Sequence, residues 1–177
     1  MNLIAFEMRL SSACAILSRS PRRDGSGSHS SASSTPPERA RDGGIELTLE
    51  EADTPVVRGD RDRLAQALDN LVSNAIKFTP AGGVVVVRLA SEYDRAVLEV
   101  TDTGIGISQA DLEQLFQRFF RTQRATSAAI PGVGLGLTIA QAIVHGHDGQ
   151  ISVQSRDGEG TTFRIELPLL RAAEVTA

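Results

Sequence analysis

Basic residues are scarce in this sequence for a protein that would bind nucleic acid, and lysine is almost absent. The 177 residues include 18 lysines and arginines against 22 aspartates and glutamates, which gives a formal net charge of −4. Lys77 is the only lysine. Because a nucleic-acid-binding protein normally presents a strongly basic face, this balance argues against a nucleic-acid partner.

Cysteines and long apolar runs are scarce as well. The single cysteine, Cys14, excludes a disulfide within the chain and gives no sign of a metal cluster. Apolar runs such as residues 84–87 are far shorter than the roughly 20 residues that a membrane-spanning helix needs. Residues 1–18 lack a basic leader and a clear cleavage site, so no signal peptide is predicted. We expect a soluble, cytoplasmic chain without a membrane segment.

The composition of the chain changes near residue 44. Residues 18–44 are dominated by Ser, Pro, Arg, Gly and Asp and show no apolar period, so they cannot bury enough surface to offset the entropy of ordering. We therefore predict a disordered or unrelated N-terminal segment over residues 1–43, within which residues 1–17 could form a short helix. The folded domain is predicted over residues 44–171, followed by a tail over residues 172–177.

Hydrophobic periodicity predicts an α+β fold for this domain. Alternating apolar residues between turn signals predict strands over 45–49, 56–57, 84–90, 96–101, 151–154 and 161–167. Helices are predicted over 60–78, with Asp60 as the N-cap, over 111–116 and over 135–145. Antiparallel strands interleaved with two long helices indicate a two-layer α+β sandwich, not a doubly wound parallel sheet.

The first long helix carries an unusual polar side. Asn70, Asn74 and Lys77 recur at i, i+4 and i+7, roughly opposite an apolar face. Asparagine is a poor residue for a helix interior, and a solvated face more often carries Glu, Gln or Arg. Its amide can ligate Mg²⁺ or donate to phosphate, and Lys77 suits a phosphate contact. From the spacing alone, a solvated surface and a functional site are equally good interpretations.

Two glycine motifs adjoin predicted elements. Asp102 ends a strand and is followed by Gly104 and Gly106, so the backbone can approach a ligand while the carboxylate accepts a hydrogen bond from it. Taken alone, this motif is better explained as a glycine-rich turn. The glycines of residues 132–137 open a helix, where free N–H groups and the helix dipole favour an anion. A flexible hinge explains this second motif equally well.

Two familiar phosphate-binding motifs are excluded. A P-loop needs Gly-Lys-Ser/Thr, whereas Lys77 lies between Ile76 and Phe78. The spacing G-x-G-x-G over residues 132–136 differs from the G-x-G-x-x-G of a dinucleotide-binding βαβ unit. A hairpin turn is sufficient to explain the segment Gly-Glu-Gly-Thr-Thr-Phe over residues 158–163.

The order and spacing of the motifs together resemble the C-terminal catalytic, ATP-binding domain of two-component sensor histidine kinases. The N box, the first glycine box, the F box and the second and third glycine boxes correspond to residues 70–80, 102–107, 115–121, 132–137 and 160–163. The match covers the chain from about residue 45 to residue 170. Five ordered motifs make a chance agreement very improbable.

This resemblance implies a Bergerat fold, with a mixed, mostly antiparallel sheet covered by helices on one face, and it implies a site for ATP and Mg²⁺. Catalytic roles then correspond to Asn70, Lys77 and Arg121, and Asn74 would hold the Mg²⁺. Residues from about 122 to 131 would form a mobile lid. The other nucleotide-binding positions are Asp102, as the acceptor for the adenine amino group, Phe78, Gly104, Ile105, Gly106, Gly132, Gly134, Leu135, Gly136, Leu137 and Thr162.

One family feature has no counterpart in this sequence. Sensor kinases carry a helical hairpin before the catalytic domain, with the phosphorylated histidine followed by an acidic residue and, a few positions later, a proline. His29 lies instead in a serine-rich run without a helical pattern. We therefore expect the histidine-bearing dimerisation domain to act in trans or to belong to the full-length gene, with a response regulator downstream. A truncated or frame-shifted gene would explain the N-terminal segment.

The chemistry implied by the resemblance is phosphoryl transfer. Related ATPases of the superfamily place a glutamate at the position of Asn70, and that glutamate activates water. Because Asn70 cannot act as a base at neutral pH, transfer to a positioned nucleophile is favoured over hydrolysis. Two alternatives stay open, namely a serine kinase similar to anti-sigma factors and a non-catalytic ATP-binding regulator.

Two further assignments are structural. Phe116, Phe119 and Phe163 are expected to pack in the core. His145 and His147 flank the end of a predicted helix and are expected to be capping or surface residues, not phosphoacceptors.

Overall fold

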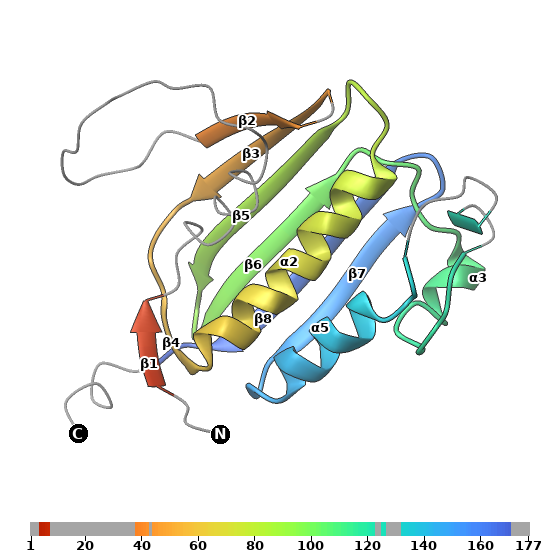
Figure 1. The fold of residues 1–177 in the computed structure, drawn as a ribbon. Helices are drawn as coiled ribbons and strands as arrows, with labels where there is room; N and C mark the ends of the chain where they lie inside the picture. The colour runs from red at the N-terminus through yellow and green to blue at the C-terminus, as the bar shows by residue number, and fades with distance from the viewer. Residues whose placement is uncertain (1–3, 8–37, 43, 123–124, 127–131, 171–177) are drawn as a thin grey trace.

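The fold is built from a six-stranded sheet with helices on one of its faces (Figure 1). The computed structural model describes residues 4–7, 38–42, 44–122, 125–126 and 132–170. The strands lie in the order β2 (Glu38–Asp42), β3 (Ile45–Glu51), β5 (Val84–Glu92), β6 (Arg95–Asp102), β8 (Gly160–Pro168) and β7 (Gln150–Arg156).

The pairing of the strands is mixed and mostly antiparallel. β3 and β5 run parallel, and every other pair of neighbours in this sheet is antiparallel. Because side chains alternate between the two faces of a strand, the apolar residues of each strand gather on one side. On β5, for example, Val85, Val87 and Leu89 are fully buried. This architecture confirms the predicted α+β sandwich.

Helix α2 (Arg61–Phe78) provides most of the second layer. Asp60 is its N-cap, as predicted, and accepts hydrogen bonds from the backbone N–H groups of Asp62 and Arg63 at 3.1 Å. The helix ends at Phe78 with Thr79 as its C-cap, just before Pro80, which lacks the N–H that a further turn would need. Its buried side packs on the sheet through Ala67, Leu68, Leu71, Val72 and Ala75.

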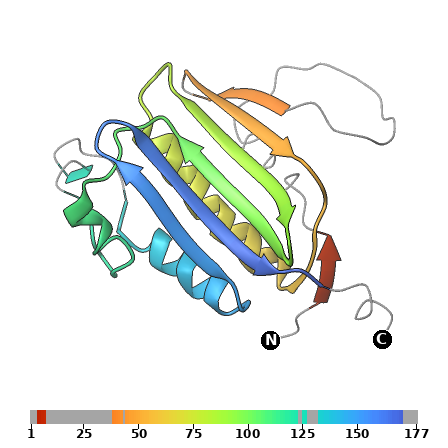
Figure 2. The ribbon, with the colours of Figure 1, turned by 180° about the vertical axis from the view of Figure 1, so that it is seen from behind.

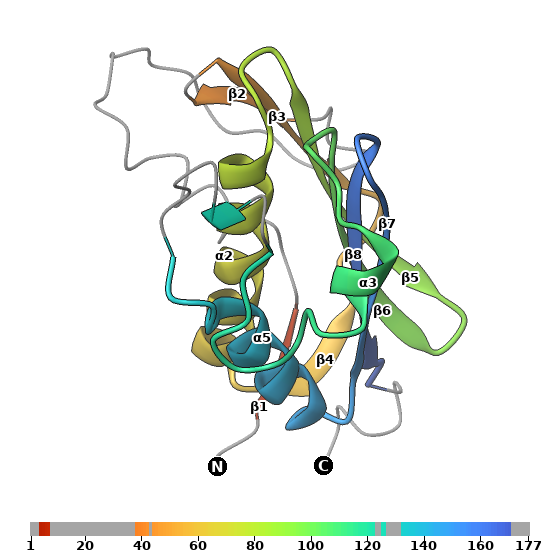
Figure 3. The same ribbon diagram turned by 90° about the vertical axis from the view of Figure 1, so that its right-hand side faces the viewer.

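Helix α5 (Gly136–His145) lies beside α2 on the same face of the sheet (Figure 3). Ala140, Ile143 and Val144 are its buried residues. The short helix α3 (Gln109–Leu112) begins earlier than the predicted 111–116, because Ser108 caps it. The Ser108 hydroxyl donates to the Asp111 carboxylate at 2.9 Å and accepts from the Asp111 N–H. Among the described residues, no helix combines the length and apolar character that crossing a membrane requires.

The other face of the sheet, seen from behind in Figure 2, carries charged side chains where β5, β6 and β8 meet. Arg164 of β8 forms ion pairs with Glu99 at 2.8 Å, with Glu92 at 2.6 Å and with Glu166 at 3.0 Å. These contacts tie three neighbouring strands together laterally. None of the described helices runs across this face.

Two strands lie where the sequence had predicted none. β1 (Ile4–Glu7) pairs antiparallel with β4 (Val56–Gly59), and β2 extends the main sheet beside β3. The predicted helix over 1–17 and the predicted disorder over 18–44 are therefore wrong for these two stretches. Both are edge strands, which need only a partner backbone with unpaired N–H and C=O groups and not an apolar period. The rest of residues 1–43 lies outside the described part of the chain.

Candidate functional site

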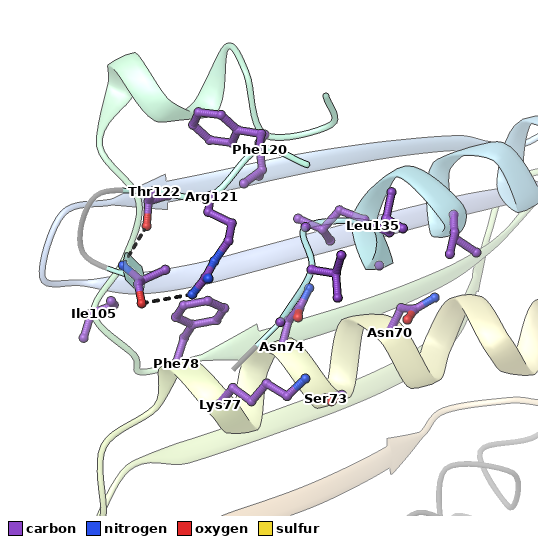
Figure 4. A pocket seen from close by; sticks show the side chains of 18 of the residues that line it. Asn70, Ser73, Asn74, Lys77, Phe78, Ile105, Phe120, Arg121, Thr122 and Leu135 are labelled. Atoms are coloured by element: carbon purple, nitrogen blue, oxygen red, sulfur yellow. Dashed lines mark hydrogen bonds between the residues drawn. The ribbon is translucent and has the colours of Figure 1, made fainter. Parts of the chain in front are cut away.

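A cavity of about 360 Å³ lies between α2, the start of α5 and the loops that follow β6 and α3 (Figure 4). The N-terminal half of α5 and the C-terminal half of α2 provide its two helical walls. Most of the residues predicted for the site line this cavity, namely Asn70, Asn74, Lys77, Phe78, Ile105, Gly106, Arg121, Gly132, Gly134, Leu135, Gly136 and Leu137.

The polar side of α2 forms one wall of the cavity. Asn70, Asn74 and Lys77 all line it, and Ser73 joins them from the same side of the helix (Figure 4). The Nδ2 atom of Asn70 is buried and has no hydrogen-bond partner within the described structure. A buried donor without a partner is costly, and a ligand that accepts from it removes that cost. The interpretation of this side as an ordinary solvated surface is therefore not supported.

The opposite wall is the glycine segment that leads into α5. Gly134 has a φ of +75°, and a Cβ atom there would lie 2.7 Å from the carbonyl oxygen of Phe120. The N–H of Phe119 donates to the carbonyl of Gly134 at 3.0 Å, which fixes this segment against the F box. Leu135, the N-cap of α5, makes no side-chain capping bond, so the first N–H groups of the helix can serve an anion in the cavity.

Arg121 and the residues after it form the rim. The guanidinium of Arg121 donates to the carbonyl of Ala125 at 3.3 Å, and the Ala125 N–H donates to the Thr122 hydroxyl at 3.1 Å. Figure 4 shows Arg121 pointing from this rim toward α2 and Phe78. Ala125 is buried and lines the cavity within a short helical turn. Apart from Thr122 and this turn, the predicted lid lies outside the described residues.

Asp102, Gly104 and Thr162 do not line this cavity. Asp102 and Thr162 border a neighbouring, more open cavity of about 530 Å³ between β6, α3, β7 and β8. Gly104 packs against the backbone of Phe78, where a Cβ atom would lie 2.5 Å from the carbonyl oxygen. Ile105 and Gly106 therefore form the part of this loop that faces the first cavity.

The carboxylate of Asp102 is buried in a hydrogen-bonded setting. It accepts from the Gly104 N–H at 2.8 Å and is only 5% exposed. Burial raises the pKa of Asp102, and hydrogen bonds from the backbone of Gly104 and Thr161 partly oppose this rise. A buried carboxylate with remaining acceptor capacity suits a ligand that offers an N–H donor.

Thr161, the neighbour of the predicted Thr162, lies directly opposite Asp102 in the sheet. The two are register partners across β6 and β8, and Thr161 is buried. Thr162 lies one position on, so its side chain points to the other face of the sheet, where its hydroxyl lies 3.1 Å from that of Thr101. The motif alone could not decide between these threonines, because the strand register that separates them depends on the partner strands.

The assignment of the phenylalanines was right for two of three. Phe163 is buried and Phe116 packs against the core. Phe119 is 66% exposed and has a φ of +63°, so its assignment to the core was wrong. The left-handed backbone that lets the Phe119 N–H reach Gly134 also turns the side chain away from the core. Val133 and Ile139, which line the mouth of the cavity, are exposed as well.

The cavity could hold a hard cation only together with a phosphate-bearing ligand. No Asp, Glu or His is among the described residues that line it, and the described residues contain no group of three His, Cys, Asp or Glu side chains arranged for a metal. Asn74 and Asn70 offer neutral amide oxygens. Mg²⁺ keeps several waters and commonly takes one or two protein ligands plus substrate phosphates, and these residues fit that pattern.

Fold and cavity together define an ATPase domain of the Bergerat type. The chain belongs to the family of histidine kinase-, DNA gyrase B- and HSP90-like ATPases, whose family model matches residues 59–171.

Several relatives and solved structures that are similar to this chain are histidine kinases. The circadian input-output histidine kinase CikA of Synechococcus elongatus is 42% identical over 134 residues, which cover 74% of this chain and 18% of that protein. The mycobacterial sensor histidine kinase MprB has a similar structure, with a TM-score of 0.63 and 36% identity over 71% of this chain and 83% of the other. Full-length ShkA in complex with AMPPNP gives a TM-score of 0.63 and 31% identity, over 73% of this chain and 26% of that one.

The chain spans only part of the curated relatives that it matches. It covers 18% of CikA and 31% of the sensor-like histidine kinase SenX3 of Mycobacterium. The matched part is the ATPase domain.

Proposed function

We propose that this chain binds ATP with Mg²⁺ and transfers the γ-phosphate to a histidine on a helical hairpin domain. That domain would be supplied by a separate chain or by the full-length gene. The observation that carries this proposal is the composition of the cavity. Amide and cationic side chains and the start of α5 face one another across it, whereas none of its described lining residues is a carboxylate. This set favours an anionic ligand and provides no base that could activate water.

Each polar residue has a role that follows from its place. Lys77 and Arg121 lie on opposite sides of the cavity, where their charges would balance the phosphate tail. Asn74 would hold Mg²⁺, with the unpartnered Asn70 amide beside it. Asp102, which borders the neighbouring cavity, would accept from the adenine amino group. The ShkA structure, which contains AMPPNP, supports a nucleotide in a domain of this fold.

The acceptor must bring its own nucleophile, because Asn70 cannot take a proton from water at neutral pH. In the proposed transfer, an imidazole nitrogen of the acceptor forms a bond to the γ-phosphorus, and the bond from that phosphorus to the bridging oxygen of ADP breaks. The chain's own part is to align the phosphates and to offset their charge. A water molecule in place of the imidazole would lack such a positioned base.

The acceptor domain is proposed to dock at the mouth of the cavity. Val133 and Ile139 line the cavity and are 69% and 37% accessible, and Phe119, whose N–H bonds the carbonyl of Gly134 in the cavity wall, is 66% accessible. Large exposed apolar side chains grouped beside a reactive site are typical of a protein-binding surface. A hairpin seated there would present its histidine to the phosphate end of the cavity. A response regulator would then take the phosphate from that histidine, on the cytoplasmic side where ATP is found.

Calorimetry tests the nucleotide site. Wild-type protein titrated with ATP and Mg²⁺ should show saturable binding at one site. Asp102→Ala should abolish it, and Asn74→Ala should make the remaining affinity insensitive to Mg²⁺. Gln66→Ala, an exposed position on the same helix, is the matched control and should behave as wild type. A folded wild-type protein that binds no ATP would refute the proposal.

A transfer assay tests the acceptor. The chain would be mixed with labelled ATP and a histidine-kinase hairpin domain, with and without the acceptor histidine. Label that depends on this histidine and is lost in acid but stable in base supports histidine transfer. An acid-stable product would indicate a serine kinase, and no transfer with intact ATP binding would indicate a regulator.

A further inference from the structure

The hairpin formed by β7 and β8 packs directly against the glycine loop that runs from Asp102 to Ile107. Ile105 and Gly106 of this loop line the first cavity, and the hairpin contacts the loop from the other side. The Gly158 N–H donates to the carbonyl of Ile105 at 2.8 Å. A Cβ atom on Gly106 would overlap the carbonyl oxygen of Arg156. The two segments therefore lie in direct backbone contact.

Ser155 of β7 sits at the centre of this contact. Its Oγ accepts from the Ile107 N–H at 2.9 Å and donates to the carbonyl of Gly160 at 2.7 Å. Since this hydroxyl hydrogen is engaged by Gly160, the Thr161 hydroxyl, 3.0 Å away, is the donor in the third contact. The single hydroxyl of Ser155 thus uses its one donor and both acceptor positions.

These bonds join the two chain segments that flank Asp102. Ile107 ends the glycine loop, whose Gly104 N–H bonds the Asp102 carboxylate. Thr161 lies opposite Asp102 as its register partner on β8, and its backbone lowers the pKa of the same carboxyl group. Asp102 is thus held between two neighbours, and Ser155 connects the segments to which both belong. No described hydrogen bond joins Ser155 to Asp102 itself, so any influence of Ser155 passes through these neighbours.

We propose that Ser155 is a positioning residue for base recognition, and this inference rests on the proposed ATP-binding function. By holding Ile107 and Thr161 at fixed places, Ser155 sets the carboxylate of Asp102 where the 6-amino group of adenine can donate to it. This role could not be predicted from the sequence, because Ser155 lies outside the glycine and asparagine motifs.

The experiment compares ATP with purine riboside triphosphate, which lacks only the 6-amino group. Wild-type protein should bind ATP more tightly. Ser155→Ala should lower ATP affinity about tenfold, the effect of losing one well-placed hydrogen bond. It should change the affinity for purine riboside triphosphate less than about twofold, because the phosphate contacts lie on other elements. Ser155→Thr, which keeps the hydroxyl, should restore most of the preference for ATP.

Two controls separate positioning from general damage. Ser152→Ala, an exposed position on the same strand, should leave both affinities unchanged. Hydrogen exchange should show the Ile107 amide losing protection in Ser155→Ala, while the Ile105 amide, which donates to Phe78, keeps its protection. If Ser155→Ala does not fold, Ser155→Cys, a weaker hydrogen-bonding residue of similar size, takes its place.

The outcomes distinguish this inference from the proposed function. If the wild-type protein binds no ATP, the proposed function fails and the role of Ser155 fails with it. If the wild-type protein binds ATP but Ser155→Ala keeps the full preference over purine riboside triphosphate, only the positioning role is overturned. An equal loss of affinity for both ligands also overturns it, since that result indicates a general loosening of the domain.

Discussion

The side chain of His147 joins the C-terminal end of α5 to the N-terminal end of α2. Its Nε2 accepts from the Asp60 N–H at 2.9 Å, and its Nδ1 lies 2.7 Å from the carbonyl oxygen of Ile143. Because Nε2 accepts, Nδ1 carries the hydrogen and donates, so both ring nitrogens are used. His147 is a capping residue, as the sequence suggested, but it is buried and not at the surface.

Replacing His147 by alanine should destabilise the fold without weakening nucleotide binding. The substitution removes the partner of the partly buried Asp60 N–H and that of the buried Ile143 carbonyl, so the free energy of unfolding should fall by about 1–3 kcal/mol. ATP affinity should change less than about twofold, since the cavity lies at the opposite ends of α2 and α5. Urea denaturation and calorimetry measure the two effects. His145→Ala, at an exposed position, is the control, and a His147→Ala variant as stable as wild type would contradict the bridging role.

Gly106 should tolerate alanine far less well than Gly82. Both have a positive φ, +67° and +87°, so both pay a backbone cost of about 1 kcal/mol as alanine. A Cβ atom on Gly106 would also overlap the Arg156 carbonyl, whereas Gly82 has nothing within 4 Å of that position. The Gly106→Ala variant should therefore lose at least about 2 kcal/mol more, measured by urea denaturation. Equal losses would show that the loop and the hairpin can separate freely.

Two substitutions of Phe119 should separate the effect of its strained backbone on stability from the effect of its side chain on docking of the hairpin domain. Phe119→Gly relieves the left-handed conformation and should raise the free energy of unfolding by about 0.5–1 kcal/mol relative to Phe119→Ala. Both variants lose the exposed ring, so both should slow phosphate transfer to the hairpin domain by about tenfold with ATP affinity unchanged. Transfer at the wild-type rate in both variants would remove Phe119 from the docking surface.

The raised pKa of Asp102 predicts a specific dependence of stability on pH. The folded state binds the proton of this carboxyl more tightly than the unfolded state, whose pKa is near the ordinary 3.8. The contribution of Asp102 to the free energy of unfolding therefore falls as pH rises from 3.8 through the folded pKa, and it is constant above that window. The Asp102→Asn variant lacks this carboxyl group, so its stability has no corresponding dependence on pH. The difference in stability, variant minus wild type, should thus increase across the window in urea denaturations.

Contacts along one element were predictable from the sequence, and contacts between elements were not. The spacing of Asn70, Asn74 and Lys77 depends on a single helix, and the structure places all three in one cavity. The separation of Asp102 from that cavity depends on how the glycine loop packs against Phe78 and the β7–β8 hairpin. Local spacing carries no information about that packing.

The same distinction explains the strands and site residues that were missed. β1 and β2 have no apolar alternation, and their pairing depends on the free edges of β4 and β3. Ser73 could have been found, because it lies four residues before Lys77 on the same side of α2. Leu115, Phe120, Thr122, Ala125, Val133 and Ile139 also line the cavity, and the identity of these residue types does not distinguish a cavity wall from a core or a surface.

The position of Lys77 gives the protein a built-in chemical reporter. Its ε-amine is exposed at the wall of the cavity, and it is the only lysine side chain in the sequence. An amine-selective acylating reagent therefore meets one side-chain target, and a bound nucleotide should shield it. Mass spectrometry of the intact chain would then show nucleotide binding as the loss of the mass that one acyl group adds at Lys77. No residue has to be mutated to introduce the label.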